Sequence, residues 1–156
     1  MLNVARRKLW FWLMGAGGVL AGGKVSAHHA DAHFDDDSSH HIVYQCNKAD
    51  PEYISHILFS VSELLRKYEE DVEIVVACFG PGLHLLGKMP GRPIPQQLQD
   101  QASSQAEYGV SFHACGNTMN AVSWGAEDLL PFAEVVPIGV DDIMQLQEKG
   151  FVYMAW

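Results

Sequence analysis

The 156-residue sequence predicts an α/β protein in which a mostly parallel sheet of about five strands lies between layers of helices. Segments with the spacing of strands and of helices alternate from residue 41 to residue 156, which favours parallel strands joined by helices. Residues 72–79 (VEIVVACF) are almost continuously apolar, as in a strand that helices cover on both faces. Right-handed crossover connections are expected between such strands.

Residues 1–27 are interpreted as a signal peptide and not as part of the fold. A basic cluster at residues 6–8 precedes an apolar run from residue 9 to about residue 21, and Val25-Ser26-Ala27 supplies the small residues of a cleavage site. We expect cleavage after Ala27 and a periplasmic mature protein. The Arg6-Arg7 pair favours the twin-arginine export route, although such pairs also occur by chance in basic leaders.

An uncleaved membrane anchor is the less favoured alternative, because a membrane span needs roughly 20 apolar residues and this glycine-rich run is shorter. Residues 1–27 contain four of the 10 Lys and Arg residues and none of the 19 Asp and Glu. The mature chain then keeps six basic against 19 acidic residues, a formal net charge of −13. Because such a surface repels phosphate groups, we expect no nucleic-acid partner and no stable attachment to anionic lipid.

Residues 28–40 are interpreted as a flexible arm that precedes a domain over residues 41–156. The arm and its border are polar and rich in histidine and aspartate, with no apolar periodicity. Histidine-rich tracts bind zinc or copper in some proteins, so a weak metal site is one hypothesis here. The fixed ligand spacing of a preformed site is missing, and a solvated linker is favoured. The histidines concerned are His28, His29, His33, His40 and His41.

The first half of the domain is predicted as strand, helix, strand and helix. Residues 41–46 are rich in β-forming residues, and Asp50 followed by Pro51 predicts the start of a helix with one apolar face that ends near Glu70. After the strand at 72–79, Gly80-Pro81-Gly82 forms a turn, a short helix begins at 83–86, and 87–95 form a loop. Residues 96–108 are predicted as a partly exposed helix. The glycine turn lacks the spacing of nucleotide-binding loops, so no cofactor is expected.

The second half begins with a short buried strand, Val110 to Ala114, that stops at Cys115. Asn117 and Thr118 are predicted to cap the helix that follows. Residues 126–131 are then predicted as a brief helical turn, in which Glu127 and Asp128 have a capping and not a catalytic role. Next come a strand at 134–138, a helix capped by Asp141, and a closing strand at 151–156, with Gly150 just past the end of the helix.

Cys115 is the candidate reactive atom. Ligands and reactive groups gather at the carboxyl ends of parallel strands, and a thiolate that faces the first amides of a helix is stabilised by partial positive charge. The alternative is a small buried apolar residue, as most free cysteines are.

Cys46 and Cys78 stand at analogous strand ends, which makes them possible auxiliary thiols. Parallel strands would place all three cysteines along one edge of the sheet. Neighbouring strands lie about 4.8 Å apart, which a disulfide tolerates, so a Cys46–Cys78 bridge that leaves Cys115 free is one alternative. A redox couple that includes Cys115, and three unpaired thiols, are the other two.

Three further residues are candidates for the same crevice. His113 lies two residues before Cys115 and so on the same face of a regular strand, where it either tunes the pKa of the thiol or is a core histidine, the favoured interpretation. His84, after the glycine turn, would reach the same edge, and Asn117 follows the cysteine. A soft metal site of His84 with Cys115 and Cys78 is the less favoured hypothesis.

Five segments taken together resemble the DsrE/DsrF-like family over residues 41–156: 41–51, 74–83, 109–115, 127–131 and 135–140. The resemblance implies a flavodoxin-like or Rossmann-like three-layer sandwich that often assembles as homotrimers or hexamers. Members with a role in sulfur metabolism relay sulfane sulfur as a persulfide, on a cysteine at the end of a strand that opens with Gly-Val. That pattern falls on Cys115, although Gly116-Asn117-Thr118 follows it in place of an alanine-rich, basic sequence.

These observations lead to two functional hypotheses. The first is an exported sulfur carrier that receives sulfane sulfur on Cys115 from donor proteins or small sulfur compounds and passes it to an acceptor thiol. Such a protein is a carrier more than a turnover enzyme, and as an enzyme it would be a sulfurtransferase. The alternative is a non-catalytic oligomeric module that binds a small ligand or metal at the strand-end crevice.

Overall fold

The computed structural model describes residues 38–156; the predicted signal peptide and nearly all of the predicted arm lie outside these residues. The described chain forms one five-stranded sheet with the strand order β4-β3-β2-β1-β5. Every neighbouring pair of strands is parallel, which confirms the predicted fold class. The strands are β1 (His40–Cys46), β2 (Val72–Cys78), β3 (Ser111–Cys115), β4 (Ala133–Val136) and β5 (Val152–Met154).

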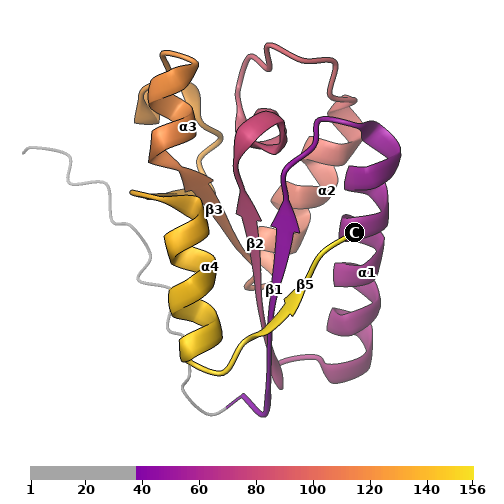
Figure 1. Ribbon diagram of the computed structural model, residues 1–156. Coiled ribbons are helices and arrows are strands. Elements are labelled where there is room, and N and C mark those ends of the chain that lie inside the picture. The colour runs from indigo at the N-terminus through magenta and orange to yellow at the C-terminus, as the bar shows by residue number, and fades with distance from the viewer. Residues whose placement is uncertain (1–37) are drawn as a thin grey trace, which may run out of the picture. The chain divides into compact units, whose positions relative to one another are not determined.

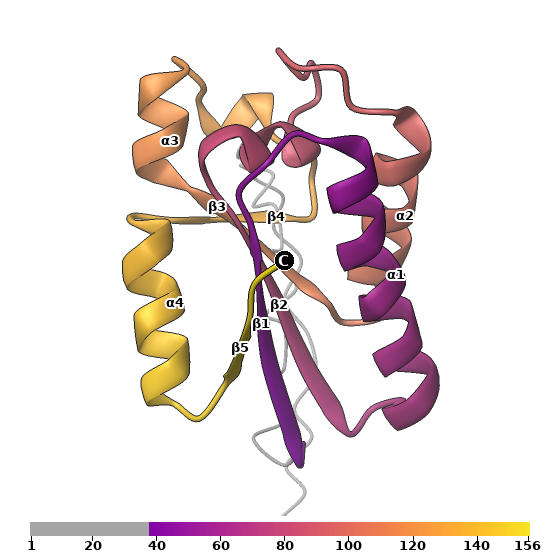
Figure 2. The same ribbon diagram turned by 45° about the vertical axis from the view of Figure 1, so that its right-hand side comes forward.

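Helices cover both faces of the sheet and make the three layers that parallel strands require (Figures 1 and 2). On one face lie α1 (Pro51–Tyr68) and α2 (Gln96–Glu107), and on the other lie α3 (Gly116–Ala121) and α4 (Gly139–Glu148). Two short 3₁₀ helices, η1 (Gly80–Leu86) and η2 (Ala126–Asp128), follow the carboxyl ends of β2 and α3. Within residues 38–156 no helix is both long and apolar enough to cross a membrane.

The two faces of the sheet carry two separate hydrophobic cores. The larger core joins α1, α2 and η1 to the side chains of Tyr44, Val76 and Phe112. The smaller core joins α4 to Val43 and Val75 on the opposite face. Because successive side chains of a strand point to opposite faces, neighbouring residues of one strand belong to different cores.

The start of α1 is fixed by the residues that the sequence indicates. The side chain of Asp50 accepts a hydrogen bond from the Tyr53 N–H at 2.8 Å, and Pro51 occupies the first helical position. The apolar face of α1 then buries Ile54, Ile57 and other side chains in the larger core.

Polar side chains of α2 are buried, which the sequence analysis did not predict. Gln99 donates hydrogen bonds to the carbonyl oxygens of Leu85 and Gly87, at 3.0 and 2.7 Å. Gln105 donates to the Leu58 carbonyl of α1 at 2.6 Å. These side-chain amides donate to backbone carbonyl oxygens where α2 contacts its neighbours. The glutamine-rich helix is therefore buried more deeply than its composition indicates.

Two predicted caps are wrong. Helix α4 begins at Gly139, two residues before Asp141, and no side chain caps it. The N-cap position of α3 is Cys115 itself, so Asn117 and Thr118 lie within the first turn of that helix. In both cases helix geometry starts within three residues of a strand end, before the polar residue that usually marks a helix start.

Replacement of Asp50 by alanine is expected to lower the free energy of unfolding by about 1 kcal/mol, because the Tyr53 N–H loses its acceptor. Urea denaturation followed by circular dichroism measures the change. Asp50→Ser keeps a capping oxygen and is expected to stay within a few tenths of a kcal/mol of the parent. Equal losses in the two variants would show that the cap contributes nothing.

Candidate functional site

The three cysteines occupy the carboxyl edge of the sheet, as predicted. Cys46, Cys78 and Cys115 are the last residues of β1, β2 and β3, and all three are free thiols and buried. Cys46 and Cys78 are register partners, whereas the partner of Cys78 on β3 is Ala114. Cys115 is therefore offset by one residue, which places it on the opposite face of the pleat.

Cys115 lies where the ends of two strands meet the starts of two helices. It ends β3 and precedes the first residue of α3, while its register partner Val136 ends β4 just before α4. The Gly139 N–H, the first amide of α4, donates a hydrogen bond to Cys115 Sγ at 3.2 Å. Two helix N-termini, each with partial positive charge, thus face one sulfur atom.

Thr118 links the thiol to the turn that follows β2. Its Oγ1 accepts a hydrogen bond from the Gly80 N–H at 3.0 Å, and its hydroxyl is also hydrogen-bonded to Cys115. Because Oγ1 accepts from Gly80 through a lone pair, its own proton stays available for the sulfur atom. Thr118 therefore supports the thiol and fixes the start of η1 with one side chain.

The pKa of the Cys115 thiol lies below its ordinary value. Burial acts to raise this pKa, because a thiolate loses solvation when only 5% of the residue is exposed. The Thr118 hydroxyl and the Gly139 N–H, which donates directly to Sγ, together with the nearby amides of Thr118 and Asn117, outweigh burial and lower the pKa. The thiolate is accordingly more populated at neutral pH than in an ordinary cysteine.

Gly139 is the residue that allows α4 to approach the sulfur atom this closely. A Cβ atom at this position would lie 3.0 Å from Cys115 Cβ and 3.4 Å from its Sγ. It would also lie 3.3 Å from Cβ of Phe79, which follows β2. A larger residue here would press on the thiol or move α4 away from it.

His113 forms a second side-chain contact between β3 and α4. Its Nδ1 lies 2.7 Å from Asp142 Oδ2, and both side chains are largely buried. His113 precedes Cys115 by two residues on β3, and Asp142 follows Gly139 by three residues on α4. The His113–Asp142 pair therefore holds the same helix start that donates to the sulfur, and His113 is more than a simple core residue.

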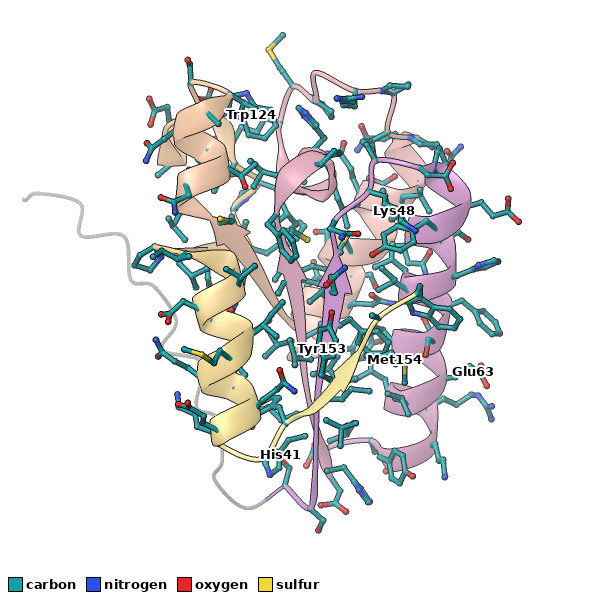
Figure 3. The ribbon with its side chains drawn as sticks, in the orientation of Figure 1. His41, Lys48, Glu63, Trp124, Tyr153 and Met154 are labelled. Atoms are coloured by element: carbon teal, nitrogen blue, oxygen red, sulfur yellow. The ribbon has the colours of Figure 1, made fainter. Side chains whose placement is uncertain are left out.

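The side chains of His84 and Asn117, both predicted to lie in the crevice at Cys115, have other contacts in the structure. His84 Nδ1 accepts a hydrogen bond from the Gly91 N–H at 3.2 Å, and its ring packs edge-on against Trp124, which Figure 3 labels. Burial, and then the Arg92 charge, lower the pKa of His84, so the neutral ring holds the loop after η1. Asn117 is exposed, and its backbone N–H donates to the Pro137 carbonyl oxygen at 3.2 Å, which joins the start of α3 to the segment before α4.

The metal hypotheses gain no support from the described residues. Among residues 38–156, no three His, Cys, Asp or Glu side chains lie close enough together to hold a metal ion. His40 and His41 belong to β1, where His40 stacks on Tyr68 and His41 Nδ1 lies 2.9 Å from Glu73 Oε2. His28, His29 and His33 lie outside the described residues.

A cavity of about 290 Å³ lies at the amino ends of the strands, at the opposite end of the sheet from Cys115. It is lined by the start of β1, including both His40 and His41, by Tyr68 at the end of α1, and by Gly150. The cavity is therefore at the amino ends of the strands and not at the predicted crevice.

The fold and the thiol site define the class of protein: a parallel α/β sandwich with a low-pKa cysteine at the carboxyl edge of its sheet. Residues 40–156 match the DsrE/DsrF-like family, so the chain belongs to that family.

Solved structures give the same result for the fold. A protein of unknown function from Methanobacterium thermoautotrophicum, MTH1491, is 26% identical, with a TM-score of 0.67 over 75% of this chain and 99% of its own. The ychN protein of E. coli is 14% identical, with a TM-score of 0.57 over the same shares, and supports the fold alone. A comparison with curated proteins found no match.

Sequence reasoning placed Cys115 at the end of a strand but did not point to Gly139 or Asp142. Both lie about 25 residues further along the chain, and only the pairing of β4 with β3 brings them to the thiol. The one available signal was a glycine directly after the fourth strand, where the adjacent strand ends in a cysteine.

Thr118→Val is expected to raise the pKa of the Cys115 thiol, because the hydroxyl that stabilises the thiolate is lost. At pH 7 the rate of alkylation by iodoacetamide should fall about tenfold, as expected for loss of a hydrogen bond to a charged group. Rates measured across pH 5–10 on the otherwise cysteine-free chain give the profile. Thr118→Ser keeps the hydroxyl and serves as the control; a profile unchanged in Thr118→Val would contradict this role.

Proposed function

We propose that this protein carries sulfane sulfur in the periplasm as a persulfide on Cys115. The observation that carries the proposal is the hydrogen bonding of Cys115 Sγ by the first amide of α4 and by Thr118, which lowers the pKa of the thiol. Membership of the DsrE/DsrF-like family supports a role related to sulfur relay. The export signal predicted in residues 1–27 supports the compartment.

The transfer begins with attack of the Cys115 thiolate on the outer sulfur of a persulfide or polysulfide donor. The new S–S bond forms on Cys115 as the donor's S–S bond breaks, and the electron pair of that bond leaves with the donor thiolate. No oxidant is needed, because the transferred sulfur enters and leaves at the sulfane oxidation level. The reverse step, attack by an acceptor thiolate on the outer sulfur, passes it on.

The environment of Cys115 suits both the free thiolate and its persulfide. A persulfide anion bears its charge on the outer sulfur atom, close to the same amides and hydroxyl that stabilise the thiolate. Because these donors are held by backbone and by a side chain fixed through Gly80, they need little rearrangement during transfer.

The burial of Cys115 favours the second candidate, a binding module without persulfide chemistry. With 5% of the residue exposed, a donor reaches the sulfur only where packing around the start of α4 opens. A sealed thiol that reacts only after unfolding would be a structural residue. The accessibility of Cys115 in the folded protein therefore separates the two functions.

We also propose that the protein assembles with copies of itself. Exposed apolar side chains precede and follow the start of α4: Ile138 comes just before it, and Val140 and Met144, one helical turn apart, reach 62% and 51% exposure. Single exposed apolar residues are common, but a group at one helix start is typical of contact surfaces.

Treatment of the mature protein with polysulfide is expected to add sulfur to Cys115. Intact mass spectrometry should show an increase of about 32 Da, the mass of one sulfur atom, that a reductant removes. Cys115→Ser should gain no such adduct. Cys46→Ala/Cys78→Ala is the matched control and should still gain it.

The opposite outcome is equally defined. An absence of adduct in the parent protein, together with alkylation of Cys115 only after unfolding, would exclude the carrier function and favour the binding module.

A Val140→Glu/Met144→Glu variant is expected to be smaller in solution than the parent, because buried charges disrupt an apolar contact. Size-exclusion chromatography with light scattering measures the mass. Phe59→Glu, a change of an exposed apolar residue on α1, is the control for a general effect of charge. A monomeric parent would overturn the proposal of self-assembly and leave the Cys115 chemistry untouched.

A further inference from the structure

We propose that Cys46 and Cys78 form a disulfide that joins the carboxyl ends of β1 and β2 and leaves Cys115 as the single free thiol of the protein. This bond is separate from the persulfide chemistry proposed for Cys115. It concerns two cysteines that take no part in that chemistry.

Strand register brings the two cysteines together. Cys46 and Cys78 are direct partners in the parallel pairing of β1 with β2, and each is the last residue of its strand. Paired strands lie about 4.8 Å apart, inside the Cα separation of roughly 4.4–6.8 Å that disulfides span.

Both thiols point to the same face of the sheet. Cys46 and Cys78 belong to the larger core, between the sheet and the helices α1 and η1, and each is 1% exposed. A hydrogen bond between the two thiols, followed by burial, raises the pKa of Cys78. The Cys78 thiol donates to the Val76 carbonyl oxygen at 3.8 Å, and the strand register places Cys46 directly beside Cys78.

The packing of η1 over Cys46 and Cys78 controls when the disulfide forms. The Phe79 N–H donates to the Cys46 carbonyl oxygen at 3.1 Å, and a Cβ atom at Gly82 would lie only 2.1 Å from that oxygen. With η1 packed this closely, the folded dithiol is sealed and, with its raised pKa, reacts slowly. The bond therefore forms while η1 is not yet packed on the edge, and once formed it is protected from reductants.

The reaction needs an oxidant, and a small-molecule or protein disulfide supplies it. The thiolate of one cysteine attacks the oxidant's S–S bond to give a mixed disulfide and one released thiol. The second cysteine then attacks its neighbour's sulfur and releases the other thiol. Two electrons and two protons pass from the pair to the oxidant, which leaves as two thiols.

Cys115 cannot join this pair, because its side chain lies on the opposite face of the pleated sheet. Cys115 faces the α4 side of the sheet, whereas Cys46 and Cys78 face the α1 side. For the proposed carrier this separation matters, because a neighbouring thiol would attack a Cys115 persulfide and release its sulfur as sulfide. With the pair oxidised, no such thiol is present in the described domain.

Counting of free thiols tests the proposal without reference to sulfur transfer. The full chain is reduced, unfolded, refolded in a glutathione redox mixture, then acid-quenched and labelled with maleimide under denaturing conditions. We expect one label per chain before reduction and three after it, since the chain has three cysteines. Cys115→Ala should give none before and two after, and a peptide digest should contain the Cys46–Cys78 bridge.

Thermal denaturation is the second measurement. Reductant present during unfolding should lower the Tm of the parent and of Cys115→Ala, and should leave that of Cys46→Ala/Cys78→Ala unchanged. Three labels before reduction, or a bridge that contains Cys115, would overturn the proposal. Failure of the polysulfide experiment with one free label per chain would remove the carrier function and leave the disulfide in place.

Discussion

The parallel pairing of β3 with β4 is the constraint on which the Cys115 site depends. It sets Val136 beside Cys115, so the chain that leaves β4 must begin its helix next to the thiol. The Gly139 N–H then has the sulfur as its acceptor, and the His113–Asp142 pair holds the helix start in that place. An antiparallel β4 would carry its helix to the other end of the sheet, and the Cys115 sulfur would lose the Gly139 N–H as a donor.

The two faces of the sheet give chemically identical thiols different roles. On the α1 face, the neighbouring Cys46 thiol and then burial raise the pKa of Cys78. On the α4 face, Cys115 is also buried, but helix amides and a hydroxyl compensate for the lost solvent. Exposure alone therefore does not distinguish Cys115 from the other two thiols; the hydrogen-bond donors around each sulfur atom do.

The fold could be predicted almost completely from local patterns, because apolar runs such as 72–78 and the Asp50-Pro51 helix start depend on nearby residues. The same patterns placed Cys115 at a strand end. They could not supply Gly139, because its proximity arises from strand order, which no local spacing encodes. They also misplaced the start of α4: Asp141 has the chemistry of a cap, but helix geometry begins directly at the glycine that meets the sulfur.

The position of β5 has a consequence for how the protein folds. β5 completes the sheet by pairing with β1, so Ile42 finds its partner Val152 about 110 residues later in the chain. During synthesis β1 therefore waits with one edge unpaired long after β2 has been made. Such an edge is a site of wrong pairing between chains. We infer that the hydrogen bond between Tyr153 and Gln45 forms among the last contacts of folding and ends this vulnerable period.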